Sequence, residues 1–165
     1  MERSFSMEIL DILAQDARTP AAIIAQMLNS SEETVKAEIK RMEDEKILLR
    51  YSTVIDEEKT ESESTIHALI EVKVTPQYRQ GYEAIAEQIS RYPEVRACYL
   101  MSGSYDFMVL VDGPNLRRVS QFVTEKLSVL NGVISTGTHF VLRKYKDNHV
   151  VMPSSRDDHR QVVTP

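Results

Sequence analysis

The chain has 165 residues, of which 42% are hydrophobic and 27% charged, with a net charge of −5. This length suits one ordinary domain or two small ones, and no apolar run approaches the ~20 residues of a membrane-spanning helix. Acidic residues near the N-terminus argue against a secretory signal, and the single cysteine excludes a disulfide framework and a cysteine-rich metal site, so we expect a cytoplasmic protein without membrane partners.

The N-terminal third predicts three short helices joined by tight turns, which is typical of a helix-turn-helix. Start signals are Thr19 with Pro20 for the second helix, and Ser30 with Glu33 three residues later for the third. Apolar residues recur at helical spacing. The expected inward positions are Phe5, Ile9, Ile12, Leu13, Ile23, Ile24, Met27, Leu28, Val35, Ile39 and Met42.

Two segments follow the predicted helices. Residues 47–55 are rich in β-branched and aromatic side chains and predict a β wing. Residues 56–64 are polar and without periodicity, which predicts a linker and a domain boundary. We therefore expect a winged helix-turn-helix domain over residues 1–60.

The remaining chain alternates strand and helix patterns. Alternation over residues 65–74 predicts a strand with Ile66, Ala68, Ile70, Val72 and Val74 on one face. Helical spacing follows at 82–89 and 116–130, and the last strand is expected over 133–145. The order is β-α-β-β-α-β, which predicts a ferredoxin-like α+β domain over 61–147 and leaves 148–165 as a disordered tail.

The segment 97–111 predicts the central hairpin of that domain. Two apolar runs, 97–101 and 107–111, flank the small and polar residues 102–106. The second run is apolar at every position, which is typical of a strand covered on both faces. The domain's helices can cover one face, and the simplest cover for the other is the sheet of a second copy.

With these two predicted domains, the chain resembles the Lrp/AsnC, or feast-or-famine, transcription regulators, which combine a winged helix-turn-helix with a RAM-type ferredoxin-like domain. The resemblance covers residues 10–146. It is carried by LDILAQDAR (10–18), VKAEIKRMEDEKIL (35–48), YPEVRACYLMSGSYDFMVLV (92–111) and GVISTGTHFVLRKYK (132–146).

The resemblance implies double-stranded DNA as a partner, an amino acid as effector, and homodimers that assemble further. The family's Gly-x-x-Asp loop binds the effector between protomers, which by position implies Met101, Ser102, Gly103, Ser104, Tyr105 and Asp106, with Thr136, Thr138 and His139 as weaker candidates. A turn's free amides can hold a carboxylate, and a carboxylate can meet an ammonium group. No catalytic, metal or cofactor residues are implied.

The third helix is the candidate DNA reader, because burying its apolar stripe leaves Lys40 and Arg41 outside to meet phosphates or base edges. The candidate contacts are Ser31, Glu33, Thr34, Lys36, Ala37, Lys40 and Arg41. The alternative is a bundle with a solvated face. Glu38 stands where many members have Arg, and Asn29-Ser30 where many have Gly-Leu. Residues 1–60 also carry all of the chain's net negative charge, which predicts a shallow salt dependence.

Other readings stay open on the sequence alone. The 102–106 segment can be an ordinary hairpin turn, and the chain can be a stand-alone amino-acid sensor that does not bind DNA. Sirohaem decarboxylases share a similar architecture, although the His-and-Arg-rich segment typical of them is absent here. His67 and His139 can share a face, but a histidine pair without a third ligand is a poor metal site, so packed or interfacial histidines are expected.

Overall fold

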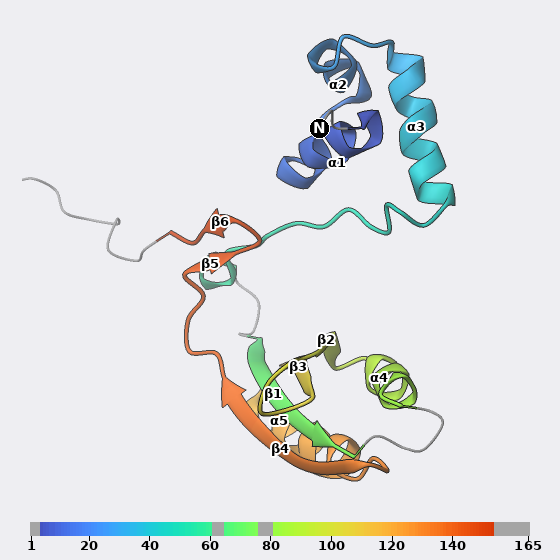
Figure 1. Cartoon of the computed structure of the whole chain (residues 1–165). Coiled ribbons are helices and arrows are strands. Elements are labelled where there is room, and N and C mark those ends of the chain that lie inside the picture. Colours follow the sequence, from blue (N-terminus) through green and yellow to red (C-terminus); the bar gives the residue numbers. More distant parts are fainter. Residues whose placement is uncertain (1–3, 61–64, 76–80, 154–165) are drawn as a thin grey trace, which may run out of the picture. The chain divides into compact units, whose positions relative to one another are not determined.

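A computed structural model of the chain describes residues 4–60, 65–75 and 81–153 (Figure 1). The chain divides into two compact units, Met1–Val54 and Ile55–Pro165. In the described ranges, no helix has both the length and the apolar character needed to cross a membrane.

The first unit is a three-helix domain: α1 (Phe5–Gln15), α2 (Ala21–Met27) and α3 (Glu32–Asp44). The predicted stripes meet in its core, where Ile9, Leu13, Ile24, Val35 and Met42 are buried. The predicted start signals for α2 and α3 were each misplaced by one residue. Pro20 occupies the N-cap of α2, and the N-cap of α3 is the residue after Ser30, while the Ser30 amide donates to a carbonyl near the end of α2.

The prediction of a β wing over residues 47–55 is wrong. Residues 47–55 contain no strand, and Leu49 is 78% exposed. A strand forms only where a neighbour accepts and donates its backbone hydrogen bonds, and no neighbour strand lies beside this segment in the described residues. The predicted linker contains a short 3₁₀ turn, Glu57–Lys59, which belongs to the second unit.

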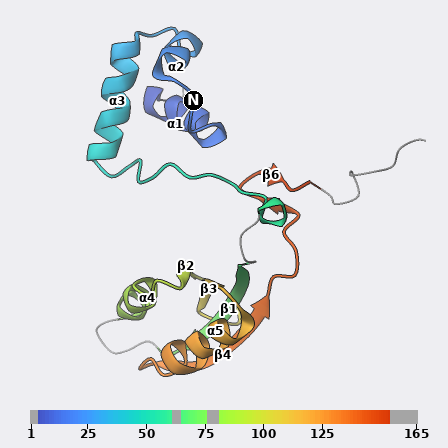
Figure 2. The same cartoon turned by 180° about the vertical axis from the view of Figure 1, so that it is seen from behind.

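The second unit confirms the predicted β-α-β-β-α-β order (Figures 1 and 2). Four antiparallel strands lie in the order β2-β3-β1-β4, and the two helices follow β1 and β3. The helix after β3 continues through one π-helical turn, Val123–Leu127. The elements are β1 (Ile66–Val74), α4 (Glu83–Ser90), β2 (Val95–Leu100), β3 (Phe107–Gly113), α5 (Leu116–Phe122) and β4 (Val133–Phe140).

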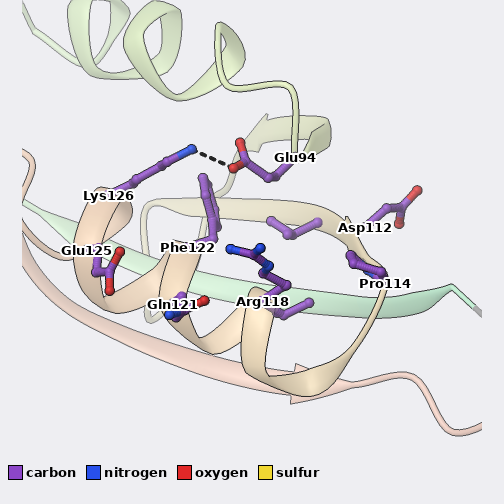
Figure 3. A pocket seen from close by; sticks show the side chains of 11 residues that line it. Glu94, Asp112, Pro114, Arg118, Gln121, Phe122, Glu125 and Lys126 are labelled. Atoms are coloured by element: carbon purple, nitrogen blue, oxygen red, sulfur yellow. Dashed lines mark hydrogen bonds and ion pairs between the residues drawn. The ribbon is translucent and has the colours of Figure 1, made fainter.

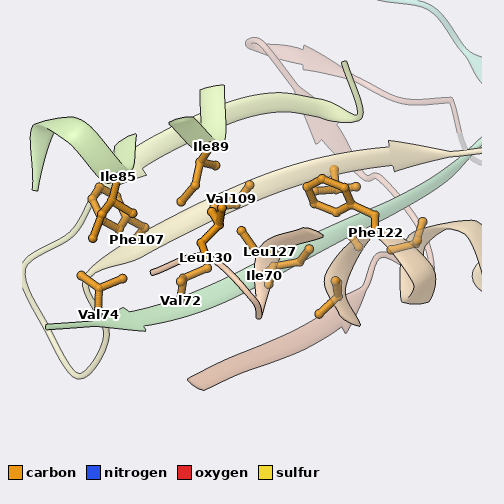
Figure 4. Packing of buried hydrophobic residues seen from close by; sticks show 14 residues of the cluster. Ile70, Val72, Val74, Ile85, Ile89, Phe107, Val109, Phe122, Leu127 and Leu130 are labelled. Carbon is orange, nitrogen blue, oxygen red and sulfur yellow. The ribbon is translucent and has the colours of Figure 1, made fainter. Parts of the chain in front are cut away.

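One face of the sheet forms the core with α4 and α5 (Figure 4). The predicted inward residues of β1 from Ala68 to Val74 are buried on this face, beside Val109 of β3, Ile89 of α4 and Phe122 of α5. The alternation of β1 therefore identified the buried face, because side chains along a strand point to opposite sides.

The opposite sheet face, which we call the open face, is covered by neither α4 nor α5. Leu69 of β1 lies opposite Leu110 of β3, and Met108 of β3 lies opposite Tyr99 of β2. Leu69, Met108 and Leu110 are half-buried, while Tyr99 is 54% exposed. The apolar character of Met108 and Leu110 explains why β3 does not alternate in sequence.

The C-terminal region differs from the prediction in two ways. Strand β4 ends at Phe140 rather than at 145, and the chain then forms a small hairpin from β5 (Lys146–Asp147) and β6 (Val150–Val151). The first residues of the expected disordered tail therefore have regular structure. Residues 154–165, the rest of that tail, lie outside the described residues.

Candidate functional site

Helix α3 presents a polar surface away from the core of the first unit. Its N-cap, Ser31, accepts a hydrogen bond from the Thr34 amide at 3.1 Å. Seven side chains proposed for DNA contact are all exposed: Ser31, Glu33, Thr34, Lys36, Ala37, Lys40 and Arg41. Helical periodicity places Glu33, Ala37 and Lys40 opposite the buried Val35. This face of the helix is therefore exposed along its length.

The two lysines of this surface are loosely paired along the helix. Lys36 Nζ lies 2.6 Å from Glu32 Oε1, and Lys40 Nζ lies 3.3 Å from Asp44 Oδ2. Both lysine side chains are at least 65% exposed, and exposed pairs of this kind contribute about 0–1 kcal/mol. The lysines can therefore exchange these carboxylates for phosphate groups at small cost.

Arg41 is held more firmly than the lysines. Its Nε and Nη2 donate to the two oxygens of Glu38 at 3.0 and 2.6 Å, and Nη1 donates to Glu45. Glu38 in turn accepts from the Ser6 hydroxyl of α1 at 2.5 Å. Glu38, which departs from the family pattern, thus joins α3 to α1, and Arg41 serves this junction.

We expect Glu38→Gln to loosen the first unit in a pH-dependent way. Hydrogen bonds from Arg41 and then Ser6 lower the pKa of Glu38 to about 2. Because the pKa of Glu38 is depressed in the folded state, its contribution to the stability of the first unit is complete above the unfolded pKa of about 4.3. That contribution is lost as pH falls through about 2. Amide exchange of α1 and α3 should be faster in the variant at pH 7, and the difference should shrink on acidification.

The control for this variant is Glu33→Gln. Glu33 lies in the first turn of the same helix and makes no side-chain hydrogen bond or ion pair in the described part of the chain. Equal acceleration of exchange in both variants would show that loss of any α3 carboxylate, rather than the junction to Ser6, causes the effect.

In the second unit, the hairpin turn between β2 and β3 is anchored by Asp106. Its Oδ2 accepts from the Val74 amide at 2.8 Å, and its Oδ1 accepts from the Tyr82 hydroxyl at 3.1 Å. The Asp106 amide donates to the Val72 carbonyl at 3.0 Å, and the Met101 amide donates to the Asp106 carbonyl at 2.8 Å. The carboxylate therefore fixes the turn to β1 and to the start of α4.

The rest of the turn is available to a ligand. Met101, Ser102, Gly103 and Ser104 are exposed, and apart from the two adjacent residues no described atom lies within 4 Å of the position that a Cβ on Gly103 would take. Tyr105 and Asp106 are half-buried. A small exposed turn on an anchored base suits the binding of a small polar molecule.

The β4 candidates do not join this turn within a single chain. Strand β1 lies between β3 and β4, which separates them by about 10 Å. Thr136 and Thr138 pair with Val72 and Ile70, on the side of the sheet that faces the helices. His139 is on the open face, with Nε2 3.3 Å from Glu71 Oε1. The turn and the β4 candidates therefore do not contact one another directly within a single chain.

A pocket of about 320 Å³ lies at the opposite end of β3 from the turn (Figure 3). Its polar rim includes Glu94, Arg118 and Lys126, and Lys126 Nζ donates to Glu94 Oε1 at 2.5 Å. Phe122 forms part of its apolar lining. None of the predicted effector residues reaches this pocket, so it is separate from the candidate site at the turn.

The ring of His67 is buried between two carboxylates, an arrangement that the sequence did not reveal. Its Nδ1 lies 2.7 Å from Asp112 Oδ1 and its Nε2 lies 2.6 Å from Glu57 Oε2. Both contacts are hydrogen bonds only when both ring nitrogens carry protons, because ionised carboxylates only accept. Lys144 Nζ also donates to Glu57 at 3.1 Å. The expected packed histidine therefore fastens the predicted linker to the sheet.

The environment of Glu57 supports this attachment. Burial alone would raise the pKa of this carboxyl group, but hydrogen bonds from His67 and Lys144 outweigh burial and lower the pKa. Its ionised form is thus favoured in the folded chain. The 3₁₀ turn that carries Glu57 is consequently part of the second unit rather than free linker.

Comparison with known proteins gives matches over both units. Residues 5–43 match the AsnC-type helix-turn-helix domain, and residues 67–151 match the Lrp/AsnC ligand binding domain. The uncharacterized HTH-type transcriptional regulator YugG of Bacillus subtilis is 42% identical over 96% of this chain and 95% of its own length. The HTH-type transcriptional regulator LysM of Saccharolobus solfataricus is 31% identical over 84% of this chain and 92% of its own.

Solved structures agree on the fold. The transcriptional regulator NMB0573 of Neisseria meningitidis, crystallised as a complex with L-Met, superimposes with a TM-score of 0.69 at 22% identity, covering 89% of this chain and 94% of that one. The relatives are transcription regulators, and none of these matches favours the enzyme alternative. The chain belongs to the Lrp/AsnC family of transcription regulators and is built from an AsnC-type helix-turn-helix and an Lrp/AsnC ligand-binding domain.

Proposed function

We propose that this regulator binds DNA through α3 of residues 1–60 and an amino acid through residues 61–147, as a homodimer or a larger assembly. The observation that supports DNA contact most directly is the exposed surface of α3. Lys36 and Lys40 lie there with only weak ion pairs, so phosphates can replace their carboxylate partners. In a symmetric dimer, two such helices would meet half-sites about one helical turn of DNA apart, or a multiple of that spacing.

The open face of the sheet supports the dimer. An apolar surface that neither α4 nor α5 covers is formed by Leu69, Met108, Leu110 and Tyr99. Removing such surface from water lowers the free energy. Burying the open face against its own copy would satisfy this need with two-fold symmetry. It would also place a second chain beside the strands that carry the effector turn and β4.

The amino-acid effector is supported by the exposed turn 101–106. Its small residues leave backbone groups accessible to a carboxylate, and Asp106 places a negative charge at its base. The L-Met complex of the Neisseria relative makes L-methionine a reasonable first probe. We expect at least one common amino acid to raise the melting temperature of the purified chain.

Two measurements test this function. Fluorescence anisotropy with the promoter DNA of the regulator's own gene should show saturable binding, and sedimentation at micromolar concentration should show a dimer or a larger species. A single-chain species that still binds promoter DNA would contradict dimerisation. Absence of promoter binding in a chain that responds to an amino acid would instead favour the sensor without DNA binding.

A further inference from the structure

The anchor of the effector turn includes a residue that lies outside the turn and outside every candidate site residue. Tyr82 stands at the N-cap position of α4, and its hydroxyl donates to Asp106 Oδ1 at 3.1 Å. Its ring packs edge-on against Phe107, with centroids 5.8 Å apart and planes at 77°. Two contacts of different kinds therefore fix the direction of this hydroxyl group.

The partners of Asp106 divide its two oxygens between separate elements. Oδ2 is occupied by the Val74 amide of β1, which is a fixed backbone donor. Oδ1 accepts from the Tyr82 hydroxyl, so Tyr82 and Val74 together fix the plane of this carboxylate, and Tyr82 supplies the side-chain share of that restraint. The bond to Asp106, followed by burial, raises the pKa of the Tyr82 hydroxyl, so the group keeps its proton and stays a donor.

We infer that Tyr82 is a positioning residue of the effector site: its hydroxyl orients Asp106 and, through it, the turn 101–106 for ligand binding. This inference rests on the proposed effector site at that turn. Each carboxylate oxygen can accept more than one hydrogen bond, so a ligand's ammonium group meets an oxygen whose direction Tyr82 has already set. A preorganised acceptor binds more tightly because less freedom is lost on binding.

The consequence is a physical link between effector and helix. Asp106 connects through Tyr82 to the first turn of α4, and α4 packs on the sheet through Ile85 and Ile89. A ligand that draws Asp106 toward the exposed turn would act on α4 through the Tyr82 hydrogen bond. Tyr82 thus lies between the ligand turn and the helical layer.

The test is Tyr82→Phe in the full chain, with Tyr92→Phe as matched control. Tyr92 also packs edge-on against a phenylalanine, Phe122, at 5.5 Å and 80°, and its hydroxyl makes no hydrogen bond in the described part of the chain. Calorimetry with each common amino acid, L-methionine first, should give wild-type affinity in Tyr92→Phe and affinity about tenfold weaker in Tyr82→Phe. Tyr82→Phe should melt slightly below Tyr92→Phe, because it loses the hydrogen bond to Asp106, while both variants should still unfold cooperatively.

A second readout needs no ligand. Amide exchange at Met101 and Asp106, whose amides bond within the anchor, should be several-fold faster in Tyr82→Phe and unchanged in Tyr92→Phe. If the wild-type chain binds an amino acid and Tyr82→Phe binds it equally well, the positioning role is wrong while the effector site stands. If no amino acid binds the wild type, the proposed effector site fails, and unchanged exchange in Tyr82→Phe would overturn the positioning role as well.

Discussion

Replacing Lys36 and Lys40 together with glutamine should weaken promoter binding by roughly a hundredfold or more at about 0.1 M salt, because a dimer would then neutralise four fewer phosphates. Both side chains are exposed and weakly paired, so their removal should leave the fold intact. The slope of log affinity against log salt should also become shallower by about 0.9 for each phosphate that is no longer neutralised. Anisotropy titrations at several salt concentrations measure both quantities.

The control removes the same amount of charge elsewhere. Arg91 at the end of α4 and Arg117 in α5 are exposed helix cations of the second unit. The double variant Arg91→Gln with Arg117→Gln should retain nearly all promoter affinity. An equal reduction of affinity in both double variants would mean that net charge alone governs binding, and α3 would then lose its assignment as the reading helix.

Asp106→Ala should damage both the stability and the ligand response of the second unit. The substitution leaves the buried Val74 amide and the Tyr82 hydroxyl without their acceptor, which costs about 1–3 kcal/mol for an unsatisfied buried group. The free energy of unfolding should fall by that amount, and amino-acid affinity should fall at least about tenfold. Chemical denaturation and calorimetry on the full chain measure the two effects.

Two further variants distinguish loss of the Asp106 hydrogen bonds from the effect of any substitution in the turn. Ser104→Ala changes an exposed side chain of the same turn that makes no side-chain hydrogen bond among the described residues. It should leave stability unchanged. Asp106→Asn keeps one good acceptor but places an amide donor against Val74 or Tyr82, so its loss of stability should be intermediate. Full stability in Asp106→Ala would show that the two hydrogen bonds do not support the turn.

Local patterns were sufficient to predict most of the fold. Spacing identified the stripes of the three N-terminal helices and the buried face of β1, because periodicity depends only on residues close in the chain. The wing prediction was wrong because a strand depends on a partner that can be distant in the chain. Residues 47–55 have strand composition but no partner strand among the described residues. The cap of α3 was misplaced because Ser30 and Ser31 are adjacent, and only the fold decides which of them is free to cap.

The candidate site was only partly visible in the sequence. The turn 101–106 was located correctly as a hairpin, but the use of Asp106 as an anchor depends on Val74 and Tyr82, which lie 32 and 24 residues away. The environment of His67 likewise depends on Glu57 and on Asp112, which lies 45 residues away. No short-range pattern signals such pairings, because they arise only when the sheet brings distant segments together.

The attachment of Glu57 to His67 also limits how much of residues 56–64 can act as a free tether. A free chain over residues 56–64 would act as a flexible tether of roughly 30 Å when extended. With residue 57 bonded to the sheet, only the chain that precedes it can serve as a tether. In a dimer, a shorter tether raises the effective concentration of the second reading helix near its half-site once the first has bound. Tolerance for altered spacing between operator half-sites should therefore widen when His67 can no longer bond both carboxylates.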